Sequence, residues 1–450
     1  MATEFMRKAL LIIASIYCGL SPLAHGVCPD LSGFYIKNDG SALVNTAWEE
    51  IRLQLNEIFD QCLLSSEYFA LYGAAQLNSG RLPESIESLE RSLMLDPDNG
   101  AALIDYADAL LRDGQLFAAI EANEMLLGRE DVPGNLKLQI SQRQRDWSNL
   151  IRQTSWQLDL LGGYDNNLNG APDEEVIQLT LSGEPIFLSL NEEFRAVQGP
   201  FLNINLMAQH RRLGPDAQHS FLGQARGRMS EDNASDVFQV VGRYNLLISR
   251  GGRNAQFGAG LNHLLFSGRP LFTGADARYR SQLGGAGRCR RFANGAIQSQ
   301  LWHEQRRLDG VEVKAGIGLD CPLGSKTEQR INLEGSVLRN FEVNENRLGG
   351  NRNGFQFEAL WRMVLSEGIL SARANYTQLT DGRGFSPLLE GNARRTVNRN
   401  SLSLQYQKEI DWPGYGTRLL LRLYHQDQNS NIGLFETEDT SFELGLRWLF

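Results

Sequence analysis

The chain has 450 residues, of which 42% are hydrophobic and 22% are charged, and its formal net charge is −9. A chain of this length can bury a substantial core and has room for more than one domain. The acidic balance and the lack of a basic patch argue against DNA or RNA, so we expect no nucleic-acid partner.

The first 26 residues predict an export signal. Arg7 and Lys8 precede an apolar run over 9–20, and a cleavage site with the small residues Ala24 and Gly26 follows. The run is too short for a spanning helix, which needs about 20 apolar residues. Cys18 suggests a lipoprotein as an alternative, but Tyr17 is too large for the position before a lipidated cysteine. We therefore expect a signal peptide over 1–26.

Four cysteines follow this segment, namely Cys28, Cys62, Cys289 and Cys321. An even number in an exported chain suggests disulfides. A bridge from Cys28 to Cys62 would tie the mature N-terminus to the first helices. A bridge from Cys289 to Cys321 would have to span an intervening strand, about 9–10 Å, unless the strands end before the cysteines. Neither cysteine nor histidine spacing fits a metal site, so we expect no metal and no cofactor.

Residues 27–153 are predicted to form a helical domain, because apolar residues recur there at three and four positions. A repeat with a shift of 34 relates Gly80 and Leu82 to Gly114 and Leu116. This is the period of the tetratricopeptide helix-turn-helix unit, although Asn123 departs from the usual apolar residue. The alternative is a plain bundle of helical hairpins. The residues that carry the repeat are Gly80, Leu82, Leu89, Pro97, Gly114 and Leu116.

After Thr154 the apolar residues alternate with polar ones, which predicts β-strands. We expect residues 154–450 to form an antiparallel transmembrane β-barrel of about fourteen strands. The candidate strands are 155–165, 199–211, 218–230, 236–250, 253–266, 274–290, 294–308, 310–321, 328–342, 353–365, 368–380, 398–411, 415–428 and 438–450.

The end of the chain carries the clearest alternation. Its apolar positions are Phe442, Leu444, Leu446, Trp448 and Phe450. A closing strand of this kind is typical of an outer-membrane barrel, and the alternative is a strand of a soluble sandwich. The connections favour the barrel, because long ones alternate with tight ones as outer loops and periplasmic turns do.

Polar residues between the apolar ones should line the lumen. A water-filled lumen of mixed charge could pass a polar or unfolded chain, although any barrel of this size must satisfy such groups in pairs. The predicted lumen charges are Asp276, Arg278, Arg280, Glu358, Arg362, Arg418 and Arg422. We find no catalytic constellation and expect no enzyme activity.

A leader, a short tetratricopeptide segment and a fourteen-strand barrel ending in Phe450 together resemble the surface lipoprotein assembly modulators, or Slam proteins. The resemblance implies an outer-membrane translocator of a Gram-negative bacterium that moves or displays a client, either a surface lipoprotein or a secreted protein. It implies a helical domain in the periplasm that engages the client. The implied partners are outer-membrane lipid, the β-barrel assembly machinery and the client protein. The alternatives are a polysaccharide export porin, which usually has more repeats, and a passive porin with an adaptor domain.

Overall fold

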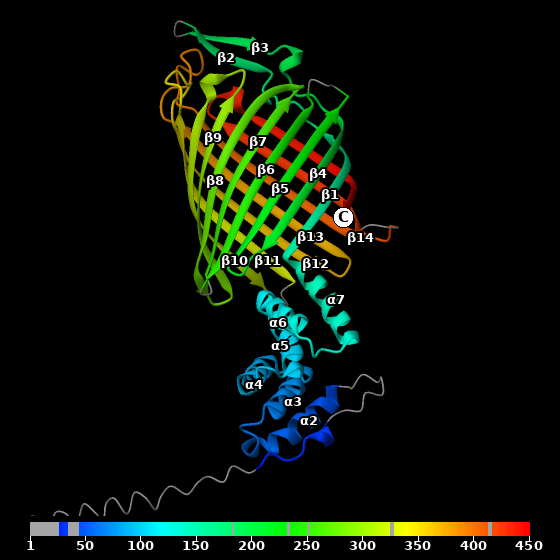
Figure 1. Cartoon of the computed structure of the whole chain (residues 1–450). Coiled ribbons are helices and arrows are strands. Elements are labelled where there is room, and N and C mark those ends of the chain that lie inside the picture. The colour runs from blue at the N-terminus through cyan, green and yellow to red at the C-terminus, as the bar shows by residue number, and fades with distance from the viewer. Residues whose placement is uncertain are drawn as a thin grey trace, which may run out of the picture. The chain divides into compact units, whose positions relative to one another are not determined.

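The computed structural model describes residues 27–34, 45–181, 184–231, 235–250, 253–324, 328–412 and 416–450. The predicted signal peptide therefore lies outside the described residues. The chain divides into two compact units, Met1–Leu150 and Ile151–Phe450. The first unit is helical and the second is a β-barrel (Figure 1).

Helices in the first unit recur with the predicted shift of 34. The six α-helices among the described residues are α2 (Asn45–Glu57), α3 (Ser66–Asn78), α4 (Leu82–Leu95), α5 (Gly100–Arg112), α6 (Leu116–Gly128) and α7 (Gly134–Ile151). Equivalent helices therefore begin at 66, 100 and 134, and at 82 and 116. No helix in the described part of the chain is long and apolar enough to cross a membrane.

Local sequence explains how each helical hairpin begins and turns. Ser65 and Asn99 cap α3 and α5, where their side chains accept hydrogen bonds from the backbone N–H groups of Tyr68 and Ala102. Gly80 and Gly114 follow α3 and α5 with φ angles of 79° and 84°, a region that glycine adopts without strain. These two glycines are the repeat residues that the 34-residue shift relates.

The core of the helical unit forms between neighbouring helices. Leu55 packs with Tyr68, Phe69 and Tyr72, and the Tyr68 hydroxyl donates a 2.8 Å hydrogen bond to the Leu55 carbonyl. A disulfide joins Cys28 to Cys62 beside this cluster, so the first predicted bridge is confirmed.

Fourteen antiparallel strands of the described chain close into one barrel, in which β1 pairs with both β4 and β16. The predicted fold class is therefore confirmed. The barrel strands are β1 (Arg152–Asp165), β4 (Gly199–Leu213), β5 (Ala217–Ser230), β6 (Val237–Arg250), β7 (Arg253–Phe266), β8 (Arg269–Ala286), β9 (Cys289–Trp302), β10 (Gly310–Leu323), β11 (Gln329–Glu342), β12 (Arg352–Leu365), β13 (Gly368–Asp381), β14 (Thr396–Ile410), β15 (Gly416–Ser430) and β16 (Thr437–Leu449).

The turn between β8 and β9 was predicted in the wrong place. The sequence prediction put it near Ala293, but it lies at Gly287 and Arg288, and Ala293 is inside β9. Gly284 has a φ of 96° at a bulge in β8, and Gly287 has a φ of 61° in the turn. The glycines that we expected in a regular strand therefore form a bulge and a turn.

This shift also corrects the expected geometry of the second disulfide. Because Cys289 opens β9, which pairs directly with β10, no strand separates it from Cys321. Their Cα atoms are 4.3 Å apart and the two residues are bridged. The pairing was predicted correctly, but the intervening strand was wrong.

Connections at the two ends of the barrel differ in length. We call the end where β1 begins and β16 ends the terminal end, and the opposite end the far end. Turns at the terminal end are short, for example 287–288 and 366–367, whereas 166–198 and 382–395 lie at the far end. The first far-end connection contains a hairpin that was not predicted, β2 (Val176–Leu181) paired with β3 (Glu184–Ser189).

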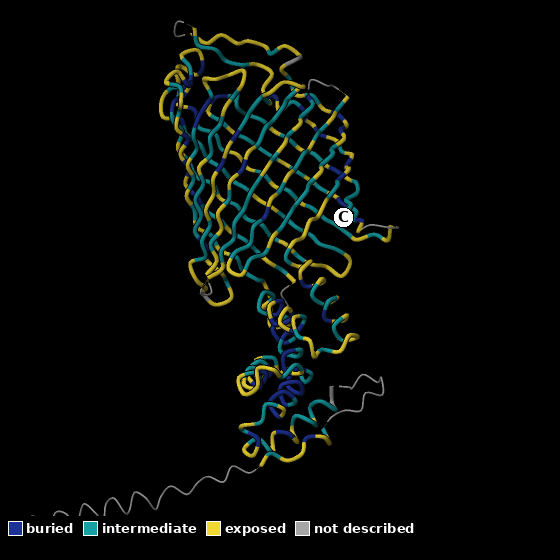
Figure 2. Tube along the Cα trace, in the orientation of Figure 1, coloured by how far each residue is buried: buried dark blue, intermediate teal, exposed yellow. Residues whose placement is uncertain are grey.

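Large apolar side chains face away from the barrel interior. Phe442 and Leu444 of β16 are each 50% exposed, whereas Glu443 between them is buried. Figure 2 shows this alternation of exposed and less exposed residues along the strands. Aromatic side chains take outward positions toward both ends, as the interfacial girdles of transmembrane barrels do. They are Trp156, Trp361, Tyr406 and Trp448 toward the terminal end and Tyr164, Phe238 and Phe341 toward the far end.

Candidate functional site

The candidate functional site is the interior of the barrel, which the polar positions of the strands line. A cavity of about 600 Å³ lies there, and four predicted lumen charges line it, namely Asp276, Arg278, Arg280 and Glu358. The others lie outside this cavity. Arg362 shares a face of β12 with Glu358, and Arg418 and Arg422 share a face of β15 with the buried Leu420.

Charges in this cavity are separated onto two walls. On β6 and β8, the basic wall carries Arg243, Arg278 and Arg280 together with Asp276. The acidic wall, on β10 to β12, carries Glu312, Glu334 and Glu358 together with Lys314. Each wall thus has an excess of one sign, and a polar solute between them would lie in a transverse electric field.

On the basic wall, the arginines outnumber the carboxylates that could neutralise them. Asp276 is engaged by Arg278, with 2.8 Å between its Oδ2 and the arginine Nε. Arg280 lies over the ring of Phe292, with 3.5 Å from its guanidinium carbon to the ring centre. One carboxylate therefore serves three guanidinium groups, so this wall favours an anionic group.

On the acidic wall, two of the three glutamates form ion pairs. Lys314 lies 3.4 Å from a carboxylate oxygen of Glu334, and Arg373 of β13 lies 3.6 Å from Glu358. Lys314 also donates to Gln356 at 3.1 Å. These long-range pairs fix the side chains along the wall while leaving polar surface in the cavity.

Several of these residues were absent from the predicted set. Arg243, Glu334 and Arg373 are not among the predicted lumen charges, although each falls on an alternate polar position of its strand. Strand alternation alone could have identified them. It could not have shown which of these side chains line one cavity, because that depends on the register between neighbouring strands.

A second polar network closes the barrel between its first and last strands. Arg447 of β16 donates hydrogen bonds of 2.7 and 2.8 Å to the two carboxylate oxygens of Asp159 on β1. Asn205 of β4 donates to the same carboxylate at 3.1 Å. Nearby, Glu443 accepts from Arg422 at 2.5 Å and from Asn203 at 2.8 Å. The predicted lumen charge Arg422 therefore supports the closure of the barrel.

At the far end, a buried carboxylate anchors the long connection between β13 and β14. Asp381 is paired with Arg352 and Arg395, each at 3.2 Å. The guanidinium of Arg395 also lies over the rings of Phe385 and Phe435, at 4.5 and 4.4 Å. This cluster holds two far-end connections together.

In the helical unit, Asn123 links α6 to α7. Its side chain is fully buried and donates to the Ile140 carbonyl at 3.1 Å and to Gln144 at 2.7 Å. It accepts a 2.7 Å hydrogen bond from Nε of Arg143, whose guanidinium lies over Trp147. The residue that departs from the repeat pattern is therefore the one that docks the next helix.

A metal site requires several histidine, cysteine or acidic side chains placed around one ion. In the described ranges, no group of three or more histidine, cysteine, aspartate or glutamate side chains is placed to hold a metal ion. Where β1 ends, Asn167 donates to the carbonyls of Ala171 and Glu438, and Asn166 accepts a hydrogen bond from the backbone N–H of Thr440. These side chains satisfy backbone groups, as asparagine often does in turns.

No protein family model matches the chain, and no curated protein matches it. Among solved structures, the anion-selective porin from Comamonas acidovorans is 9% identical, with 66% of this chain and 99% of that chain covered and a TM-score of 0.35. OprD from Pseudomonas aeruginosa is 9% identical, with coverages of 66% and 95% and a TM-score of 0.31. The helical part is similar to the type III secretion translocator chaperone SycD from Yersinia enterocolitica, which is 17% identical, with coverages of 23% and 74% and a TM-score of 0.22. Each similarity is weak, so the assignment of an outer-membrane barrel rests on the strands and side chains of this chain.

Proposed function

We propose that this protein is a translocator of the Slam type, which moves or displays a client protein across the outer membrane. The client would be a surface lipoprotein or a secreted protein. One observation carries the proposal, namely that a single chain joins a closed barrel with a charged lumen to helical hairpins that repeat every 34 residues. The proposal assigns no catalytic step and no cofactor to the protein.

The proposed orientation places the terminal end of the barrel in the periplasm. The helical unit leads directly into β1 at that end, and short turns gather there. Short periplasmic turns and longer outer connections are the usual arrangement in outer-membrane barrels. In this orientation the helical unit is periplasmic, where it can meet a client before the barrel does.

The helical hairpins are proposed to be tetratricopeptide units that hold an extended segment of the client. Stacked units of this kind expose a concave surface, which suits a peptide better than a small solute. Such a surface can pair with backbone and side-chain groups of an unfolded chain.

The barrel is proposed to offer the passage. The walls of opposite charge around the lumen cavity keep it hydrated, which suits a polar polypeptide that would not cross the lipid. We further propose that the β-barrel assembly machinery recognises the terminal strand, whose outward side ends in Trp448 and Phe450. The remaining partner is the lipid that covers the apolar outer wall.

Deleting the gene and comparing the surface proteome with a stain for surface polysaccharide tests this function. We expect the loss of one or a few surface proteins, normal polysaccharide, and rescue by the full chain. A chain lacking residues 45–150 should still insert but fail to rescue. Loss of polysaccharide with an unchanged surface proteome would instead support an export porin for polysaccharide and overturn the proposal.

A further inference from the structure

The outer wall of the barrel carries a trough that the lumen function does not use. It lies between two adjacent rows of outward side chains that cross β9 to β15 in register. The first row consists of Arg291, Leu319, Leu333, Ala359, Ala374, Leu402 and His425. The second continues from Ile317 through Gly335, Phe357, Tyr376 and Asn400 to Asp427.

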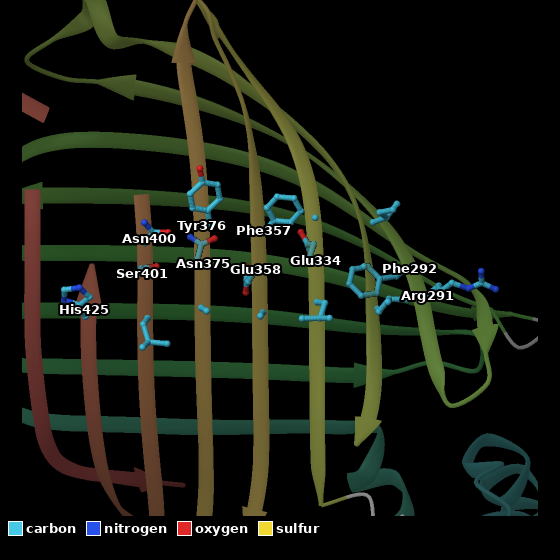
Figure 3. Close-up of a pocket in the computed structure, with 18 of the residues that line it drawn as sticks. Arg291, Phe292, Glu334, Phe357, Glu358, Asn375, Tyr376, Asn400, Ser401 and His425 are labelled. Carbon is cyan, nitrogen blue, oxygen red and sulfur yellow. The ribbon is translucent and has the colours of Figure 1, made fainter. Parts of the chain in front are cut away.

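Small residues create the hollow and large apolar residues form its sides. Gly335, Ala359 and Ala374 occupy its centre, while Phe357 and Tyr376 stand along one side. The trough has a volume of about 950 Å³. Figure 3 shows Phe357 and Tyr376 on neighbouring strands, with Arg291 and His425 at opposite ends of the row.

The trough crosses the membrane at an angle. Arg291 is the third residue of β9, which begins at Cys289, whereas His425 is the tenth residue of β15, which begins at Gly416. Both strands begin at the terminal end, so the row rises from that end toward the far end. With strands tilted by about 45°, a rise of seven residues spans roughly 16 Å, close to one leaflet of a hydrocarbon core of about 30 Å.

Basic residues gather where the trough meets the terminal end. Arg288 lies in the turn before β9 and Arg291 is exposed on the outer face. The nearby Asp320 pairs with Arg330 at 2.6 Å and lies 3.6 Å from Arg290, so its charge is already engaged. The disulfide of Cys289 fixes this turn to β10. Among the described residues, no carboxylate forms an ion pair with Arg288 or Arg291, so an anionic headgroup at this interface would meet cations that are still available.

We propose that the trough is a binding site for one anionic glycerophospholipid. Its phosphate would lie at Arg288 and Arg291, and one acyl chain would follow the trough past Ala359 and Ala374. The direction of the trough, with the charge at the terminal end, matches a lipid of the periplasmic leaflet. That leaflet follows from the orientation in the proposed function, whereas binding itself can be measured without a client.

The test is lipid retention by the full chain purified in mild detergent, followed by titration of the delipidated barrel with phosphatidylglycerol and with phosphatidylethanolamine. We expect one anionic lipid per chain by native mass spectrometry and tighter binding of phosphatidylglycerol. Ala359→Phe and the Arg288→Gln/Arg291→Gln pair should each weaken phosphatidylglycerol binding by roughly tenfold. Ala225→Phe on β5 and Arg253→Gln on β7 are matched controls on other strands and should bind normally.

A second variant separates trough filling from misfolding. Ala359→Cys can be alkylated with a bulky maleimide after the barrel has folded, and the modified protein should lose the lipid that the unmodified variant retains. Equal binding of both phospholipids, equal loss in the control variants, or retention of lipopolysaccharide in place of phospholipid would overturn the proposal. Lipid binding and client delivery are separate readouts. A variant that loses the lipid but delivers its client normally would show that this site has no role in delivery. A variant that retains the lipid but no longer delivers its client would count against neither the site nor its ligand.

Discussion

Arg447 of β16 and Asp159 of β1 form a bidentate ion pair, with two hydrogen bonds, that joins the last strand of the barrel to the first. The carboxylate is almost completely buried, with 3% of its side chain exposed. The pair lies on the lumen side of the β1–β16 junction. In the described barrel, this is the only junction that joins the two ends of the strand order. Closure therefore brings together residues 288 positions apart in the chain.

Replacing one member of this pair should destabilise the closed barrel. Asp159→Asn leaves the Arg447 guanidinium buried without its counter-ion, which costs roughly 3–5 kcal/mol when a buried pair is broken. We expect the folded form on a gel to convert to the unfolded form at a lower temperature. The measurement is the midpoint of heat-modifiable migration.

Arg418→Gln provides the matched control. Arg418 pairs with Glu409 at 2.7 Å between neighbouring strands, but that glutamate side chain is 78% exposed. Exposed pairs contribute about 0–1 kcal/mol, so the midpoint should hardly move. An equal shift in both variants would show that the junction pair has no special role.

Asn123→Leu should loosen the docking of α7 on α6. The substitution removes both hydrogen bonds that Asn123 donates and leaves Nε of Arg143 without its acceptor. Unsatisfied buried polar groups cost roughly 1–3 kcal/mol each. We expect faster hydrogen exchange over 134–151, as followed by mass spectrometry.

The neighbouring Glu124→Gln is the control for Asn123. Glu124 is exposed and accepts one hydrogen bond from Gln144. Its replacement should leave exchange in α7 unchanged within error. If Asn123→Leu leaves that exchange equally unchanged, the buried network does not hold α7.

The helical unit should lose stability as the pH rises through about 6. Burial, with a smaller contribution from nearby Asp108, raises the pKa of Asp105 to about 6, and Arg143 opposes the shift. Because this acid ionises more readily in the unfolded chain, its contribution is fully present below the unfolded pKa of about 4 and is lost as the pH passes the folded pKa.

Asp105→Asn should remove this loss. We expect the free energy of unfolding of the helical unit at pH 7.5 to rise by roughly 1–2 kcal/mol, which allows for the partial exposure of the side chain. Thermal melting of the helical circular dichroism signal at pH 5 and pH 7.5 measures it. The exposed Asp113→Asn control should keep the pH dependence of the original chain, and a variant of Asp105 that also keeps it would contradict the prediction.

Phe450→Ala should reduce assembly of the barrel in the membrane. Phe450 exchanges backbone hydrogen bonds of 3.0 and 3.1 Å with Trp156, and its side chain is 51% exposed on the outer wall. The substitution keeps those backbone bonds and removes the terminal aromatic group that the assembly machinery is proposed to read. We expect several-fold lower membrane levels on immunoblots, with Leu421→Ala, another outward apolar residue, as the control. Normal levels of the Phe450 variant would argue against recognition of that side chain.

Periodicity predicted much of the architecture because it is a local property. Side chains two apart share a face of a strand, so the alternation of Phe442, Leu444 and Leu446 marks the outer wall wherever the strand pairs. Likewise, the 34-residue shift between Gly80 and Gly114 reflects two turns that each need the same backbone conformation.

Turn positions were harder to predict, since several glycines close together permit more than one turn. The stretch from Gly284 to Gly287 can continue a strand, bulge or turn, and strand pairing selects among these. Because the turn was misplaced, the prediction put one strand between Cys289 and Cys321, whereas their strands are direct neighbours. The β2–β3 hairpin was missed for a related reason, since a long connection gives no indication of what it pairs with.

By itself, the sequence determined that the chain has a helical part with a 34-residue period and a barrel part with one apolar and one polar face. Only the tertiary structure decided which polar residues meet, such as Asp159 with Arg447, and which apolar rows line up into a trough past Ala359 and Ala374. The physical reason is that the backbone of a single strand determines the side to which each side chain points. Register and barrel closure are determined between different strands, some of them far apart in the chain.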